Sequence, residues 1–184
     1  MITLKLSTLA ITLGLGYALP QLYAFGNPKG YVEALRKFPR SVPWGCALMG
    51  LATIWFLYNV SQESIADFAA YKKHMMIAFG AVGVGACVFV KDFLSVRGLA
   101  VLLLLLAKLM VDTGRPHLGE SPLVVVNQSA AYVLVVLGIW LTIAPWRMRD
   151  WINWNTAEDQ RMKVGAAVRL ACGLSFAALG VFVF

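Results

Sequence analysis

The sequence is poor in charged residues and has no long polar linker. Charged residues occupy 14% of the 184 positions and apolar residues 60%, whereas an ordinary soluble domain has about 25% and about 45–50%. A water-soluble core of this size could not hold so much apolar surface. Because no Ser/Gly-rich or Pro-rich stretch divides the chain, we expect residues 1–184 to form a single transmembrane helical domain.

Cysteine and histidine are scarce. Cys46, Cys87 and Cys172 are isolated within apolar stretches, so we interpret them as small buried hydrophobic residues and predict no metal site. The only histidines are His74 and His117. No Ser-His-Asp, His-Glu-x-x-His or paired-carboxylate arrangement is visible, so catalysis has no recognisable carrier and we do not expect an enzyme.

Six apolar segments approach the length of about 20 residues that a helix needs to cross a membrane. They are residues 6–24, 43–60, 75–90, 93–111, 123–144 and 164–184. The sequence therefore predicts an all-α integral membrane protein, a bundle of about six transmembrane helices. Segments 75–90 and 93–111 could instead form a tight helical hairpin, since the first is short and the second contains two cations. Pro20 should kink or stop the first helix.

The positive charges between these segments are unequally divided. The formal net charge of +7 would suggest nucleic acid in a soluble protein, but the positive-inside bias of membrane proteins explains these cations better, and we expect no nucleic-acid partner. One face would carry Lys29, Arg36, Lys37, Arg40, Lys91, Arg97, Arg147, Arg149, Arg161 and Lys163, and the other Lys5, Lys72, Lys73, Lys108 and Arg115. We therefore expect the first face in the cytosol and both termini outside, in a bacterial cytoplasmic membrane.

Two segments on the predicted cytoplasmic side have the pattern of amphipathic helices lying in the interface. In residues 31–38, apolar residues recur at helical spacing opposite basic ones. In residues 146–154, three tryptophans gather on one side of a helix, either as membrane anchors or as a docking surface for a partner protein. The expected interfacial residues are Trp44, Trp146, Trp151 and Trp154.

Small residues recur four positions apart in several of the apolar segments. Such pairs let the backbones of membrane helices approach closely. The pairs are Ala10 and Gly14, Thr12 and Gly16, Cys46 and Gly50, Ala81 and Gly85, and Gly173 and Ala177.

The densest polar cluster runs from Lys108, near the end of the fourth segment, to Pro122, just before the fifth. Its ionisable members are Lys108, Asp112, Arg115, His117 and Glu120. They could bind an anion, a quinone headgroup or a proton in transit, or they could simply form a solvated turn. Asn127 and Gln128 follow inside the fifth segment, where they either form interhelical hydrogen bonds or line a polar pathway with this cluster.

A short resemblance links residues 96–99 (VRGL) and 168–171 (VRLA). The match is too short to indicate a duplicated unit. The common need for a cation that extends toward the membrane surface accounts for both Arg97 and Arg169.

Three functional hypotheses follow, of which the first is preferred. It is a non-catalytic accessory subunit of a larger membrane complex, whose partners are the lipid bilayer and other membrane subunits. The second is a small transporter or channel that uses the polar cluster with Asn127 and Gln128. The third is a redox subunit that holds haem or quinone near His74 and His117, although the sequence itself requires no cofactor.

Overall fold

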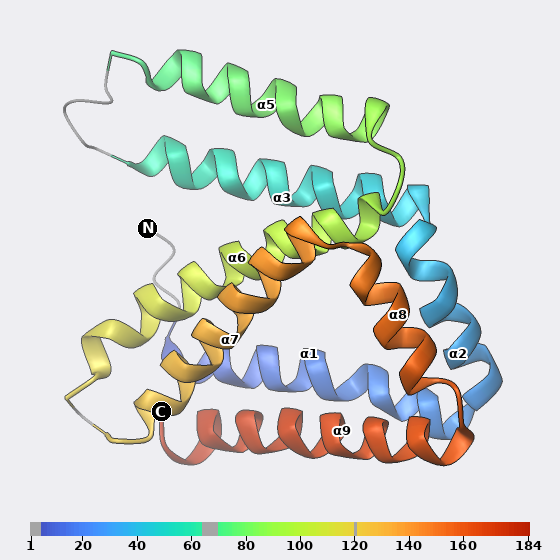
Figure 1. Ribbon diagram of the computed structural model, residues 1–184. Coiled ribbons are helices and arrows are strands. Elements are labelled where there is room, and N and C mark those ends of the chain that lie inside the picture. The colour runs from blue at the N-terminus through green and yellow to red at the C-terminus, as the bar shows by residue number, and fades with distance from the viewer. Residues whose placement is uncertain (1–4, 64–69, 120) are drawn as a thin grey trace. The chain divides into compact units, whose positions relative to one another are not determined.

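The structure is a computed structural model that describes residues 5–63, 70–119 and 121–184, and in these residues every regular element is a helix (Figure 1). The all-α prediction is confirmed. Within this part of the chain, six helices are long and apolar enough to cross a membrane. They are α1 (Leu6–Gly26), α3 (Val42–Gln62), α5 (Lys72–Phe89), α6 (Leu94–Gly114), α7 (Val124–Ile143) and α9 (Asp159–Phe182).

The remaining elements are short and join the long helices. Two are ten-residue helices, α2 (Pro28–Lys37) and α8 (Trp146–Asn155). The others are 3₁₀ turns, η1 (Phe38–Arg40) and η2 (Arg115–His117). The helices predicted over residues 31–38 and 146–154 are thus present, and only Phe38 falls outside α2.

Three of the differences from the predicted helix boundaries have a physical reason. α1 continues through Pro20 to Gly26, so the helix does not stop at this proline, and the alternative of a kink there stays a prediction. The carbonyl that loses its helical donor to Pro20 belongs to Gly16, which has open space where a side chain would be. α6 starts at Leu94 because Phe93 has a φ of 52°, a left-handed conformation that an α-helix excludes.

The third difference concerns α9, which begins at Asp159 rather than at residue 164. The first turn is polar, so the apolar pattern alone does not reveal it. Asp159 lies in that turn, where a negative charge interacts favourably with the helix dipole.

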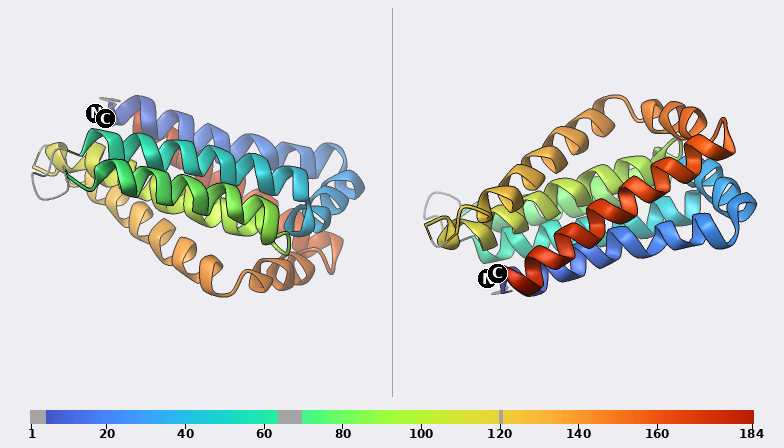
Figure 2. Two further views of the ribbon diagram at one scale, coloured as in Figure 1. Left: turned by 90° about the horizontal axis from the view of Figure 1, so that it is seen from above. Right: turned by 90° about the horizontal axis from the view of Figure 1, so that it is seen from below.

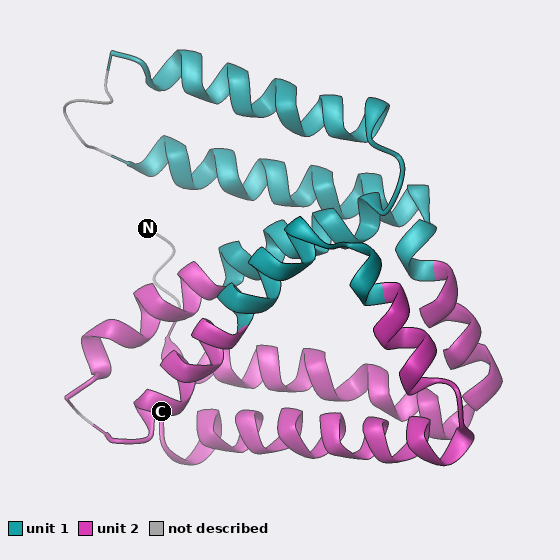
Figure 3. Cartoon of the chain, viewed as in Figure 1, with its two compact units in different colours: residues 1, 38–106, 134–148 teal, residues 2–37, 107–133, 149–184 magenta. Residues whose placement is uncertain are grey.

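The described residues divide into two compact units, shown in separate colours in Figure 3. Unit 1 contains residues 38–106 and 134–148. Unit 2 contains residues 5–37, 107–133 and 149–184. The boundaries fall inside α6, α7 and α8, so each unit combines segments that are distant in the sequence. The prediction of a single domain over residues 1–184 stays a prediction.

In unit 1, α3 and α5 run side by side (Figure 2). Gly83 of α5 makes room for Thr53 of α3, whose side chain occupies the space that a Cβ at that glycine would need. A second set of contacts joins α6 to α7 through a buried apolar cluster. Its members are Phe93, Val96, Ala100 and Leu141, with Leu103 and Met148 packed against them.

In unit 2, α1 and α9 lie antiparallel and in close contact (Figures 1 and 2). A Cβ at Gly14 would be 2.5 Å from the backbone nitrogen of Ala177, and one at Gly173 would be 2.7 Å from the carbonyl oxygen of Gly14. The close packing predicted for Gly14 of α1 and for Gly173 and Ala177 of α9 is therefore confirmed. Next to this contact, Ala24 and Tyr31 form a buried cluster with Met162.

The other small-residue pairs are not filled in this way. At Gly16 of α1 and Gly50 of α3, a Cβ would have no neighbouring atom within 4 Å, and at Gly85 of α5 it would meet only a residue of its own helix. Cys172 is also exposed, contrary to the expectation of a buried thiol, because α9 turns the adjacent Gly173 toward α1.

Candidate functional site

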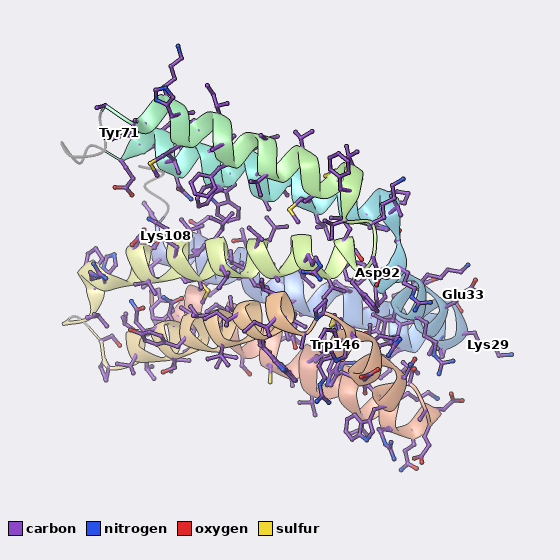
Figure 4. All side chains as sticks on the ribbon, turned by 45° about the horizontal axis from the view of Figure 1, so that its top comes forward. Lys29, Glu33, Tyr71, Asp92, Lys108 and Trp146 are labelled. Atoms are coloured by element: carbon purple, nitrogen blue, oxygen red, sulfur yellow. The ribbon has the colours of Figure 1, made fainter. Side chains whose placement is uncertain are left out.

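The polar cluster that follows the fourth apolar segment is mostly solvent-facing. Lys108 and Asp112 form an ion pair on α6, with 2.6 Å between Nζ and Oδ2 and nearly half of each side chain exposed; Figure 4 labels Lys108 on this helix. Arg115 is exposed in η2, and His117 is half-buried in the same turn. Glu120 lies outside the described residues. An exposed pair of this kind contributes about 0–1 kcal/mol to stability.

Asn127 and Gln128 are both buried and donate hydrogen bonds to α6. The Asn127 Nδ2 donates to the carbonyl of Met110 at 3.1 Å, and the Gln128 Nε2 donates to the carbonyl of Val111 at 3.4 Å. A carbonyl oxygen can accept a second hydrogen bond beside its helical one, so these amides join α7 to the last turns of α6. The arrangement favours interhelical hydrogen bonding over a polar pathway.

Gly114 makes this arrangement possible. A Cβ at this position would lie 2.6 Å from the Asn127 Nδ2 and 2.7 Å from the Gln128 Nε2. The end of α6 therefore accepts only a residue without a side chain if both amides are to reach it.

The two histidines lie in different units. His74 is exposed in the first turn of α5 in unit 1, and His117 belongs to unit 2. Neither unit contains both rings. In the residues that the structure describes, no group of three or more His, Cys, Asp or Glu side chains is placed to hold a metal ion.

The predicted interfacial tryptophans are all exposed. Trp44 lies in the first turn of α3, and Trp146 starts α8, where Figure 4 labels it. Trp151 and Trp154 each lie against an arginine of α9. The guanidinium carbon of Arg169 is 5.6 Å from the Trp151 ring centre, and that of Arg161 is 5.0 Å from the Trp154 ring centre.

The outer face of α2 is polar, as its pattern predicts. Lys29 and Glu33 extend outward from this helix (Figure 4). The Lys37 ammonium donates a hydrogen bond to Glu33 at 2.6 Å, and this contact holds the pKa of Glu33 below its ordinary value. The buried residue of α2 is Tyr31.

A polar cluster in unit 2, centred on Arg169, is not evident from the sequence pattern. The Arg169 Nε donates to the Gln21 Oε1 at 2.9 Å, and the Tyr31 hydroxyl donates to the same oxygen at 3.0 Å. These residues come from α9, α1 and α2. We call them, together with Trp151 and Asn155 of α8, the Arg169 site.

Two N–H donors of the Arg169 site are buried without a hydrogen-bond partner. They are the Nη2 of Arg169 and the Nδ2 of Asn155. The two side chains meet over Gly165, where a Cβ would be 2.7 Å from the Asn155 Oδ1 and 3.3 Å from the Arg169 Nη1. Gly165 thus lets an amide and a guanidinium converge on one point.

The residue after Asn155 is fixed by an arginine of α2. Arg36 donates from Nε to the Thr156 Oγ1 and from Nη2 to the Thr156 carbonyl, both at 3.1 Å. A cation at the end of a helix also interacts favourably with the helix dipole. Arg36 therefore holds the end of α8, and with it Asn155, against α2.

The class that this geometry defines is a helical protein with six candidate membrane spans and, in unit 2, a partly unsatisfied arginine site. No protein family, curated protein or solved structure matches the chain. The N–H donors of the Arg169 site suit an anion. No nucleophile paired with a base is part of the site.

Proposed function

We propose that this chain is an integral membrane protein whose six long helices all cross the bilayer. The shortest, α5, has 18 residues, which span about 27 Å and so approach the roughly 30 Å of hydrocarbon. In this topology α2 and α8 lie in the cytoplasmic interface, and the termini face outward. Two groups of cations support this topology, those of α2 and those of the first turns of α9. Both helices contribute residues to the same buried cluster, so the two groups lie at one end of unit 2.

Cysteine labelling tests this topology. In a chain whose native cysteines are replaced by serine, Lys37→Cys and Leu118→Cys each introduce one thiol at an exposed position. A membrane-impermeant maleimide added to intact cells should label the thiol at 118, and should label the thiol at 37 only after the cells are opened. The reverse pattern would overturn the orientation, and labelling of both in intact cells would overturn the insertion.

We further propose that the protein is a non-catalytic subunit of a larger membrane assembly. The observation that carries this proposal is the exposure of α5. Only 6% of its 18 residues are buried. This helix also has an exposed small residue at Ala81 and a half-buried one at Gly85, and Gly50 of α3 has open space around it. In lipid, small residues promote association when another helix packs against them, so these positions suit a partner helix.

Purification in a mild detergent tests the subunit function. A tagged chain should carry a stoichiometric membrane partner, and Gly85→Leu should reduce its recovery because the larger side chain blocks close approach. Val84→Leu is the matched control, since it enlarges a neighbouring exposed side chain without filling a small-residue position. A purified monomer that moves a solute in liposomes would contradict the proposal.

The transport and redox alternatives have less support. Asn127 and Gln128 direct their donors to backbone carbonyls rather than leave them free for a solute. The redox hypothesis needs His74 and His117 together, and neither unit by itself contains both.

A further inference from the structure

The guanidinium of Arg169 is an incompletely satisfied cation inside unit 2. Its protein acceptor is Gln21, a neutral amide whose oxygen is shared with Tyr31. Among the residues that the structure describes, no carboxylate forms an ion pair with Arg169. Its Nη2 is buried without a partner. A buried charge normally has both a hydrogen-bond partner and a counter-charge.

Asn155 supplies the second unsatisfied donor. Only 4% of this residue is exposed, and its Nδ2 has no partner. The Asn155 Oδ1 lies over Gly165 beside the Arg169 guanidinium, and Nδ2 is bonded to the same carbon, so a ligand with several acceptor oxygens could receive a hydrogen bond from each residue. Two neighbouring helices, α8 and α9, thus present donors to the same ligand.

The charge of the site selects an anion, and the geometry of arginine suits phosphate. A guanidinium presents parallel N–H groups that match two phosphate oxygens. Arg36, which donates to the hydroxyl and the carbonyl of Thr156, lies at the same end of unit 2 and increases its positive charge. A phosphate group therefore fits the chemistry better than a neutral carbonyl does.

The surroundings of the site are apolar on the outside. Trp151 lies against Arg169, and Leu22 of α1 and Val168 of α9 are more than half exposed. In the proposed topology, Arg169 lies five residues beyond the start of the apolar run at Val164, a distance of roughly 7.5 Å along the helix. This is the depth at which lipid headgroups give way to acyl chains.

We propose that the Arg169 site binds the phosphate group of an anionic phospholipid from the cytoplasmic leaflet. Arg169 and Asn155 donate to the phosphate oxygens, Trp151 lies beside the headgroup, and the acyl chains lie along the exposed apolar residues of α1 and α9. This inference rests on the proposed membrane insertion of α9. The labelling test of topology addresses insertion separately, so a chain that inserts but ignores lipid fails only the lipid proposal.

Lipid binding can be measured on the full chain, delipidated in a neutral detergent. Phosphatidylglycerol should raise the melting temperature and remain bound in native mass spectrometry, whereas phosphatidylcholine should do so much less. Inorganic phosphate at the same concentration separates the two sources of this chemistry. An equal response to inorganic phosphate alone would overturn the assignment to a lipid.

Two substitutions test the site itself. Arg169→Gln should weaken phosphatidylglycerol binding by about tenfold or more, since it removes a charge-assisted hydrogen bond. Asn155→Asp places a carboxylate beside the guanidinium. It should raise the melting temperature without lipid and abolish the response to lipid, which keeps the test informative if Arg169→Gln does not fold.

Arg161→Gln is the matched control, because it removes the same charge from the same helix outside the Arg169 site. This variant should retain the response to phosphatidylglycerol. The proposal is overturned if Asn155→Asp binds phosphatidylglycerol as the native chain does, or if Arg161→Gln loses binding to the same extent as Arg169→Gln.

Discussion

Gly14 and Ala177 bring the backbones of α1 and α9 into direct contact. A Cβ at Gly14 would lie 2.5 Å from the backbone nitrogen of Ala177 and 2.6 Å from the carbonyl oxygen of Gly173. Both of these atoms belong to a helix backbone, so neither can move aside as a flexible side chain could. The contact therefore depends on the absence of a side chain at residue 14.

Gly14→Ala should destabilise unit 2. The added methyl group must push α1 and α9 apart, and overpacking of this kind costs about 1–3 kcal/mol in the free energy of unfolding. Gly16→Ala, on the same helix with open space around it, is the control and should be neutral or slightly stabilising. Unfolding by titration with sodium dodecyl sulfate measures both. Equal stability of the two variants would mean that α1 and α9 do not pack in this way.

Gly114→Ala should weaken the junction of α6 and α7. The methyl group would displace the amides of Asn127 and Gln128 from the carbonyls that accept their hydrogen bonds. Buried amides left without acceptors cost about 1–3 kcal/mol each. Gly119→Ala is the control, because nothing lies near that position.

The same unfolding titration distinguishes these two glycines. The Gly114 variant should unfold at a lower detergent fraction than the native chain, and the Gly119 variant should match it. If both variants behave alike, the amides of α7 do not hold α7 against the end of α6.

Arg36→Gln should loosen the end of α8. It removes two hydrogen bonds to Thr156 and a cation at a helix end, which together contribute about 1–2 kcal/mol. Lys37→Gln removes a neighbouring cation whose exposed pair with Glu33 contributes little. Hydrogen exchange at the amides of α8 should accelerate in the first variant only, and unchanged exchange in both would contradict the role assigned to Arg36.

The sequence is sufficient to predict the six long helices, because uninterrupted apolar runs are a local property. It also predicts α2 and α8 from short-range spacing. It does not predict that α9 starts at Asp159, since a polar turn carries no apolar signal, or that Phe93 adopts a left-handed conformation. A local pattern shows which residues share one face of a helix. It does not show where the helix ends or where the backbone is strained.

The Arg169 site cannot be predicted from the sequence because its contacts are distant along the chain. Arg169 meets Gln21, which is 148 positions away, and the local pattern indicates only a cation extending toward the membrane surface. A signal is nevertheless present: Arg169 lies in the interior of an apolar run, where an ionisable residue indicates function. The small-residue pairs pose the same difficulty, since Gly14 and Gly16 have the same local pattern and only Gly14 contacts α9.

Cys46 and Cys87 offer a test of how α3 and α5 pack in unit 1. Both are half-buried on neighbouring helices and close enough to interact, although the sequence places them 41 positions apart. Oxidation with copper phenanthroline should join them, each thiol losing a proton and one electron to the oxidant. Cys172 is exposed on α9 and should remain a free thiol.

Mass spectrometry of the intact chain after alkylation with a maleimide reads out this reaction. The oxidised native chain should accept the reagent at Cys172 alone, whereas the oxidised Cys46→Ser variant should accept it at Cys87 as well. Helices that approach only transiently would also give some product, so the yield matters: rapid and nearly complete protection is expected for thiols that face each other across a stable helix contact. Alkylation of all three cysteines after oxidation would mean that α3 and α5 do not present these residues to each other.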